Sequence, residues 1–217
     1  MIRLFVIIST ALLTVPAYAG GTAPTPTATK AVAKPAGGPG TSAVKSANEK
    51  IAALLKQKPA AGSAEEKALA GKVATSVREF LDIDELGKRA MSEQWPKLTD
   101  AQKEEFLATL RALIEDNYIK GLRSNLAFTV DYTNETADKD GNVVVATTIN
   151  TKRKNRAFKI QVDYVLKKQG DKLKAWDVKT DGVGLVENYR TQFNKIVEKE
   201  GFTGLIASMK KKQGSAG

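Results

Sequence analysis

The hydrophobic period of this chain changes between residues 122 and 126, and that change constrains the fold more than any other feature. Before it, apolar residues recur every three or four positions, which is the spacing of amphipathic helices. After it, apolar and polar residues alternate, which is typical of strands with one buried face and one exposed face. The longest alternating stretch places five apolar side chains on one face: Phe158, Ile160, Val162, Tyr164 and Leu166. The sequence therefore predicts helices followed by an antiparallel sheet with one dry face.

The helical part of the pattern predicts four helices before the strands. The first covers residues 45–57, and each of the next three follows a residue that is a good N-cap. Ser63 forms a capping box with Glu66, three residues later. Asp82 precedes a short helix, and Thr99 precedes a long one. Each helix carries an apolar stripe, which helices of this length need in order to stay folded by packing.

Turn signals at residues 139–141 and 169–172 divide the alternating region into an antiparallel meander of about four strands. Two more helical stretches, residues 185–199 and 201–211, follow the strands. Helices gathered on one face of an antiparallel sheet make an α+β fold. A twisted sheet of this kind can curl around a helix layer and leave a concavity between the layers. A solid core gives the same pattern, so the residues alone leave both possibilities open.

Histidine and cysteine are both absent from the sequence, and their absence excludes several classes of enzyme and metal site. Ser-His-Asp and Cys-His catalysis are impossible, as are zinc sites built from Cys or His. The chain also lacks the glycine-rich phosphate-binding motifs and the G-x-S-x-G nucleophile motif. A hydrolase that uses a pair of carboxylates survives as an alternative, but the acidic residues are scattered among lysines, as on a solvated surface. We therefore expect a protein that is not an enzyme.

The first 19 residues have the pattern of a cleaved secretory signal peptide. Arg3 precedes an apolar stretch, and the small-x-small sequence A-Y-A ends at Ala19. The apolar stretch is shorter than the ~20 residues of a membrane span, which disfavours the alternative of an uncleaved anchor. Residues 20–43 are rich in Ala, Pro, Thr and Gly and are predicted to be a disordered spacer. Residues 44–213 remain as one folded domain of ordinary size.

The formal net charge is +10, from 34 basic and 24 acidic residues. In a cytosolic chain this charge would suggest nucleic acid as a partner. For an exported chain, anionic lipid head groups or an acidic protein face are the better candidates. A further interpretation is that the charge only keeps the protein soluble. Charge by itself does not decide between these interpretations.

Three segments of the predicted domain carry a more specific signal. They read D-x-x-x-L-G-K-R-A at residues 82–90, W-x-x-L-[ST]-x-x-Q-[KR]-x-E-F at residues 95–106, and D-G-V-x-L-V-x-N-Y-R-x-Q-F-x-x-I at residues 181–196. Together they resemble the MlaC, or toluene-tolerance, family of periplasmic phospholipid-binding proteins. The third is the most specific, because its Asn-Tyr-Arg triplet is unusual. The chain departs from the family in its spacer and at Gly184, where a serine is expected, which puts the N-cap of the following helix in doubt.

The resemblance implies a twisted antiparallel sheet of about four strands, with helices on one face that enclose an apolar lipid cavity. It implies a soluble carrier in the periplasm of a Gram-negative cell, a monomer that binds no nucleic acid and no cofactor and holds phospholipid as cargo. The implied partners are an outer-membrane lipoprotein complex and an inner-membrane ABC transporter with a substrate-binding ring. The implied role is exchange of glycerophospholipid that maintains outer-membrane lipid asymmetry. The alternatives are an envelope scaffold with a solid core and a binding protein for another hydrophobic solute.

The strand alternation, the helical stripes and the resemblance together predict twelve cavity residues. They are Leu110, Ile114, Val130, Tyr132, Ile160, Val162, Tyr164, Trp176, Val178, Leu185, Tyr189 and Phe193. The polar residues Asn188 and Arg190 flank this stripe, and two interpretations are open for them. They lie near the mouth of the cavity, or they bond to strand ends or to Asp181 and fix the helix on the sheet. We favour the second, because buried polar groups need partners, and it gives a structural role to four residues: Asp181, Gly182, Asn188 and Arg190.

Overall fold

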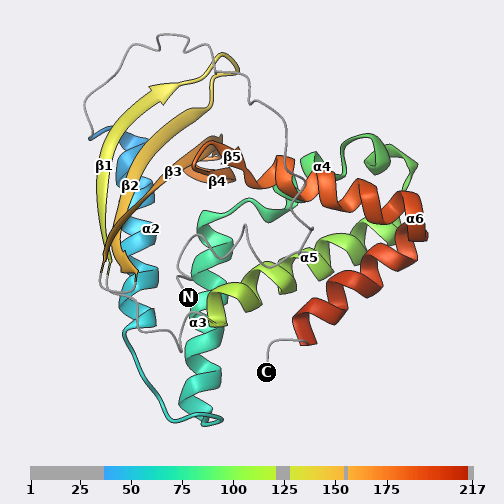
Figure 1. The fold of residues 1–217 in the computed structure, drawn as a ribbon, viewed down its shortest axis with the longest axis horizontal. Coiled ribbons are helices and arrows are strands. Elements are labelled where there is room, and N and C mark those ends of the chain that lie inside the picture. Colours follow the sequence, from blue (N-terminus) through green and yellow to red (C-terminus); the bar gives the residue numbers. More distant parts are fainter. Residues whose placement is uncertain (1–36, 121–127, 154–155, 215–217) are drawn as a thin grey trace.

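The computed structural model describes residues 37–120, 128–153 and 156–214. Within these residues an antiparallel sheet curves around one helix, a second helix packs beside that one, and the remaining helices pack together on the far side of the second (Figure 1). The elements in chain order are α2 (Pro39–Leu55), α3 (Ala64–Phe80), α4 (Ile83–Met91), the 3₁₀ helix η1 (Ser92–Lys97), α5 (Asp100–Lys120), β1 (Phe128–Ala137), β2 (Val143–Arg153), β3 (Arg156–Gln169), β4 (Lys172–Thr180), β5 (Val183–Gly184) and α6 (Leu185–Gly214). The predicted α+β class is confirmed, whereas the predicted signal peptide lies outside the described residues.

The sheet is a meander in which every strand pairs with the next, in the order β1-β2-β3-β4-β5. All of its named pairs are antiparallel, as the alternation predicts. The structure adds a fifth strand to the predicted four, the two-residue β5, which pairs with the end of β4. Asp181 and Gly182 form the connecting turn, with φ of 48° and 85°. Positive φ at both central residues is the geometry of a tight hairpin turn whose twist matches the flanking strands.

Two irregularities of register decide which side chains face inward. On β1 the pairing shifts between Tyr132 and Asn134, so that Tyr132 is opposite Thr147 and Glu135 is opposite Val145. On β4 the pairing shifts around Trp176. Each shift inserts an unpaired residue, which reverses the inward and outward alternation along the rest of the strand. The bulge on β1 therefore turns the carboxylate of Glu135 toward the helices.

That carboxylate explains why α2 begins earlier than the sequence indicates. Helix α2 starts at Pro39 rather than near residue 45, so residues 39–43 are helical and do not belong to a disordered spacer. The backbone N–H groups of Gly40 and Thr41 donate to Glu135 at 3.2 and 2.7 Å, and the Thr41 hydroxyl donates at 2.7 Å. A carboxylate at this position satisfies N–H groups that have no partner within the helix and complements its dipole.

The predicted local caps of the other helices are present. The Ser63 hydroxyl accepts from Glu66 N–H at 3.1 Å, but the Glu66 carboxylate accepts from Gly62 N–H and not from Ser63 N–H, so the predicted capping box is only half formed. The Asp82 carboxylate accepts from Glu85 N–H at 3.1 Å. Thr99 and Gln102 bond reciprocally through side chain and backbone at the start of α5. Among the described residues, none of the helices combines the length and the apolar character that a membrane crossing requires.

The hydrophobic core lies between the inner face of the sheet and the helices. Its largest fully buried side chains come from both layers and include Tyr164 on β3, Phe106 on α5, and Tyr189 and Phe193 on α6. Helix α6 bends at Gly201, where φ is 66°, and this divides it into the two stretches that the sequence predicts. Both halves contribute buried residues to the same core.

Candidate functional site

The structure brings all twelve predicted cavity residues together. Nine of them are buried, and the other three, Val130, Tyr132 and Trp176, are partly buried and pack against the same cluster. The strand residues come from the inner face of the sheet, and the helical residues come from α5 and α6. The sheet and the helices therefore meet where the sequence places the cavity. Contact between these side chains and lipid stays a prediction.

Aromatic rings join the two long helices at the centre of this interface. Tyr189 stacks on Phe193 one turn further along α6, with ring centroids 5.1 Å apart and planes 13° from parallel. Phe193 in turn meets Phe106 of α5 edge to face, with centroids 5.5 Å apart. Both arrangements are favourable for aromatic quadrupoles. They hold the Asn-Tyr-Arg segment of α6 against the core.

The four tyrosines beyond the predicted signal peptide converge in this interface, and we call them the tyrosine cluster: Tyr118 of α5, Tyr132 of β1, Tyr164 of β3 and Tyr189 of α6. Burial is the largest cause that raises the pKa of each phenol. Tyr189 further raises the pKa of Tyr118, and Tyr118 and Tyr132 further raise that of Tyr164, which places these groups within electrostatic range of one another. Asn48 of α2 donates to the Tyr132 hydroxyl at 3.2 Å. The cluster therefore consists of neutral phenols in an apolar setting.

One member of the tyrosine cluster, Tyr118, is absent from the sequence-based prediction. It lies four residues after Ile114 on the inward stripe of α5 and is 7% exposed. Its position on that stripe is the signal that could have identified it. Tyr189, by contrast, is among the twelve predicted residues, and its side chain faces inward. Its hydroxyl is buried and has no hydrogen-bond partner among the described residues.

A pocket of about 800 Å³ lies next to this interface, between α2, α3 and the hairpin of β3 and β4. Its lining is apolar at Ala43, Ala47, Phe80, Val143, Leu166 and Leu173 and charged at Lys50, Lys168, Lys172, Glu79 and Asp171. None of the twelve predicted residues lines it. The ring of Phe80 lies edge-on to Tyr164, with centroids 5.8 Å apart, so a single side chain separates this pocket from the tyrosine cluster.

The sequence did not indicate this pocket, because its walls come from segments that are far apart in the chain. The volume is within the range of small-molecule sites, roughly 300–1,000 Å³. Its mixture of apolar side chains and lysines suits an amphiphile with an anionic group. Among the described residues, no group of three or more Asp, Glu, His or Cys side chains is placed to hold a metal ion.

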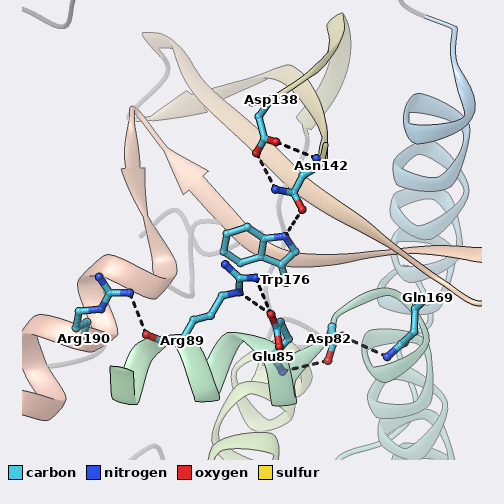
Figure 2. Close-up of polar contacts among 8 residues, drawn as sticks. All are labelled: Asp82, Glu85, Arg89, Asp138, Asn142, Gln169, Trp176 and Arg190. Carbon is cyan, nitrogen blue, oxygen red and sulfur yellow. Dashed lines mark hydrogen bonds and ion pairs between the residues drawn. The ribbon is translucent and has the colours of Figure 1, made fainter. Parts of the chain in front are cut away.

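A row of polar contacts connects the sheet to α4 (Figure 2). Asp138 accepts from the Asn142 side chain at 2.8 Å, and Asn142 accepts from the indole N–H of Trp176 at 3.3 Å. The guanidinium of Arg89 lies over the Trp176 ring, 4.0 Å from its centroid, and donates to Glu85 at 2.7 Å. The cation over the ring, itself paired with Glu85, and the bond to Asn142 hold Trp176 in its bulge. Trp176 therefore packs on the core with one edge and bonds polar groups with another.

Arg190 extends this row to α6 and corrects one expectation (Figure 2). Its guanidinium donates to the backbone carbonyl of Arg89 at 3.0 Å, at the end of α4. The predicted partners were strand ends or Asp181. Asp181 instead accepts from Gln161 N–H at 3.1 Å and donates its own N–H to the Gln161 carbonyl. Arg190 therefore links α6 to α4 and not to the sheet as expected, because α6 packs on α4.

The other residues of the predicted structural motif lie close by. Asn188 accepts from the side chain of Gln192, one turn further along α6, at 2.6 Å. Gly182 completes the tight turn before β5 with its positive φ of 85°. The bond and the turn are both local features, and both lie next to the start of α6. The bond of Asn188 to Gln192 stays within α6 and does not reach a strand end or Asp181, whereas Gly182 shapes the turn that precedes the helix.

The doubt about the N-cap of α6 is resolved by Asp177. This buried residue of β4 accepts from Val186 N–H at 3.0 Å and from Val178 N–H at 2.9 Å. A Cβ on Gly184 would lie 2.8 Å from the other carboxylate oxygen of Asp177. The absence of a side chain at residue 184 thus leaves room for the carboxylate that caps the helix. Burial raises the pKa of Asp177, although its backbone hydrogen bonds act in the opposite direction.

Comparisons with known proteins agree with this arrangement. The family model described as MlaC protein matches residues 45–211. A solved structure of the phospholipid-binding protein from Ralstonia solanacearum, in complex with a phospholipid, is similar with a TM-score of 0.66. It shares 23% sequence identity over 80% of this chain and 96% of that one, a likeness that shows a common fold. A search of curated proteins finds no match. Because the family model spans nearly all of the folded domain, the chain belongs to the MlaC family.

Proposed function

We propose that the protein is a periplasmic phospholipid carrier, which accepts a glycerophospholipid from one membrane and delivers it to another. The observation that carries this proposal is the family match over residues 45–211. The fold is that of a protein described as binding phospholipid. The interface between sheet and helices supports it as well, because apolar side chains from both layers converge there. The N-terminal sequence favours export to the periplasm.

The physical task of such a carrier is to replace the membrane around the acyl chains. Each buried methylene is worth ~0.8 kcal/mol, so two chains of about 15 methylenes would lose roughly 20 kcal/mol or more on entering water. We propose that the chains lie between the sheet and α5 and α6, among the twelve predicted residues. The phosphate stays near water, where Lys168 and Lys172 of the pocket offer positive charge; Lys50 of the same pocket is paired with Glu79 at 2.6 Å.

The proposed partners follow from the family. They are an outer-membrane lipoprotein complex and an inner-membrane ABC transporter with its substrate-binding ring, and exchange between them maintains outer-membrane lipid asymmetry. The net charge of +10 supports docking on anionic lipid surfaces or acidic protein faces, because electrostatic attraction raises the rate of encounter. No cofactor is needed for this role, and the cargo is the phospholipid itself.

Extraction of the purified mature protein with organic solvent tests the proposal. We expect phospholipid in a fixed ratio to protein by mass spectrometry, and transfer of labelled phospholipid from donor vesicles to acceptor vesicles. Protein stripped of lipid serves as the control and should reload from vesicles. Lipid-free protein of full thermal stability that transfers nothing would instead indicate an envelope scaffold. Recovery of a different apolar compound would indicate a carrier for another solute.

A further inference from the structure

The tyrosine cluster contains a hydrogen-bond donor that has no acceptor in the part of the chain that the structure describes. The Tyr189 side chain is 1% exposed, and its hydroxyl has no partner among the described residues. Buried polar groups are nearly always hydrogen-bonded, so an exception calls for an explanation such as a ligand. The ring of Tyr189 is held by stacking on Phe193, which fixes the direction of the hydroxyl. The donor is therefore positioned in advance of any ligand.

The chemistry of the surroundings restricts what can accept this bond. The Tyr189 phenol is neutral, because burial raises its pKa. The groups recorded around Tyr189 are apolar or neutral: its ring stacks on Phe193, it lies in the hydrophobic core cluster, and the phenol of Tyr118 is within electrostatic range. A phosphate placed here would be a buried anion without a counter-ion, which is strongly unfavourable. The acceptor should therefore be a neutral oxygen.

A phospholipid offers one kind of neutral acceptor in its apolar half, the carbonyl oxygens of its acyl esters. These carbonyls join the glycerol to the chains, so they lie between the apolar tails and the anionic head group. The protein has a similar order: charged side chains line the pocket, the ring of Phe80 comes next, and Tyr164 of the tyrosine cluster follows. In both the protein and the lipid, neutral polar groups follow the charged end, since Phe80 of the pocket contacts Tyr164 of the tyrosine cluster.

We propose that the hydroxyl of Tyr189 donates a hydrogen bond to an ester carbonyl oxygen of the bound lipid, so that the tyrosine cluster recognises ester-linked acyl chains. This inference rests on the proposed function, because it assigns a polar subsite to the lipid that the carrier holds. This hydrogen bond would make the carrier prefer diacyl lipids over dialkyl ether lipids. The ether lipids can have the same length and head group but have no ester carbonyl.

The experiment compares a diester phospholipid with its diether analogue on lipid-free protein, for the wild type and for Tyr189→Phe. The ring and its stacking are kept in this variant, and only the donor is removed. We expect the wild type to prefer the diester about tenfold, the equivalent of one good hydrogen bond. In Tyr189→Phe the preference should fall to about one, while diether binding stays unchanged. The thermal midpoint of the lipid-free variant should be equal or higher, because an unsatisfied buried hydroxyl is gone.

Infrared spectra of a lipid labelled with ¹³C at its ester carbonyls provide a second readout. A hydrogen bond lowers the carbonyl stretching frequency, so the band of the bound lipid should move up in Tyr189→Phe. Equal affinity of the wild type for both lipids would overturn the inference, and so would a preference that survives in the variant with an unchanged band. If neither lipid binds, the proposed function itself fails. If both lipids bind equally well, only this inference fails, so the two failures are distinguishable.

Discussion

At the scale of single residues, a carboxylate from another element caps α6, where the family pattern led us to expect a serine. Asp177 of β4 caps α6 by accepting from Val186 N–H, and Gly184 leaves room for its second oxygen. The carboxylate is buried beside the core, which favours its neutral form, while its hydrogen bonds favour the charged form. Burial is the larger effect, because the pKa of Asp177 is raised.

This balance predicts how stability depends on pH. The folded protein holds the proton of Asp177 more tightly than the unfolded chain does, so its contribution to stability falls as pH rises from near 3.8 through the raised pKa. Asp177→Asn keeps an acceptor for Val186 N–H but does not titrate. The free energy of unfolding of the wild type, minus that of the variant, should therefore be larger at the acidic end of this window than at neutral pH.

Urea unfolding at several pH values measures this difference, and an equal difference at every pH would contradict the prediction. Asp177→Ala serves as the comparison, since it removes the acceptor altogether. It should cost about 1 kcal/mol or more at neutral pH, the usual value of a lost N-cap.

At the scale of elements, α2 depends on a strand that follows it by about 90 residues. Glu135 reaches the first turn of α2 because a bulge turns it inward, and Asn48 bonds to Tyr132 further along the same strand. The backbone of α2 also approaches β2 closely at Gly40, where a Cβ would lie 2.5 Å from Val143. Helix α2 is thus held on the sheet by polar contacts at its first turn and at Asn48, and by a close backbone approach at Gly40.

Removal of the Glu135 carboxylate should therefore loosen the start of α2. Glu135→Ala leaves two buried N–H groups and one hydroxyl without their acceptor and should cost about 1–3 kcal/mol of stability. Glu135→Gln keeps one acceptor oxygen and should cost less. Hydrogen exchange should become faster at Gly40 and Thr41. The exposed Glu104 provides a matched control, and Glu104→Ala should stay within about 0.5 kcal/mol of the wild type; an equal effect of both alanine variants would contradict the role of Glu135.

At the scale of the whole molecule, the two faces of one strand separate the proposed lipid site from the packing on the opposite face of the sheet. Val162 and Val165 are both buried on β3, at 0% and 2% exposure. Val162 faces the helices within the core cluster, whereas Val165 is opposite Asp177 on the other face of the sheet. A carrier needs space on the first face alone, because the acyl chains are proposed to lie there.

Tryptophan substitutions at these two positions test where the acyl chains lie. Val162→Trp should fill space that the lipid uses, so phospholipid per folded protein should fall sharply while the thermal midpoint changes little. Val165→Trp should leave the lipid content unchanged and cost about 1–3 kcal/mol, as overpacking of a solid core does. Mass spectrometry of extracted lipid beside a thermal melt measures both quantities. A lower melting temperature with unchanged lipid in Val162→Trp would show that this residue belongs to a solid core.

Local order in the sequence determined which segments are helices and which are strands. The change of hydrophobic period, the caps at Ser63, Asp82 and Thr99, and the inward face of β3 depend on residues within a few positions of one another, so they could be predicted. The three family segments indicated the fold for the same reason, because they are continuous. The twelve predicted residues do meet, since inward faces of packed elements must share one core.

Tertiary structure alone decided the contacts that join separate helices and strands. The bond from Thr41 to Glu135 at the start of α2 and the link from Arg190 to Arg89 join residues 94 and 101 positions apart. The cap of α6 by Asp177 spans nine residues and depends on the turn between β4 and β5. The pocket and the tyrosine cluster likewise draw on several elements. Such contacts depend on strand register, and a single bulge reverses which side chains face inward. The sequence carries no local mark of where those bulges at Thr133 and Trp176 fall, so only the folded sheet shows which polar groups meet.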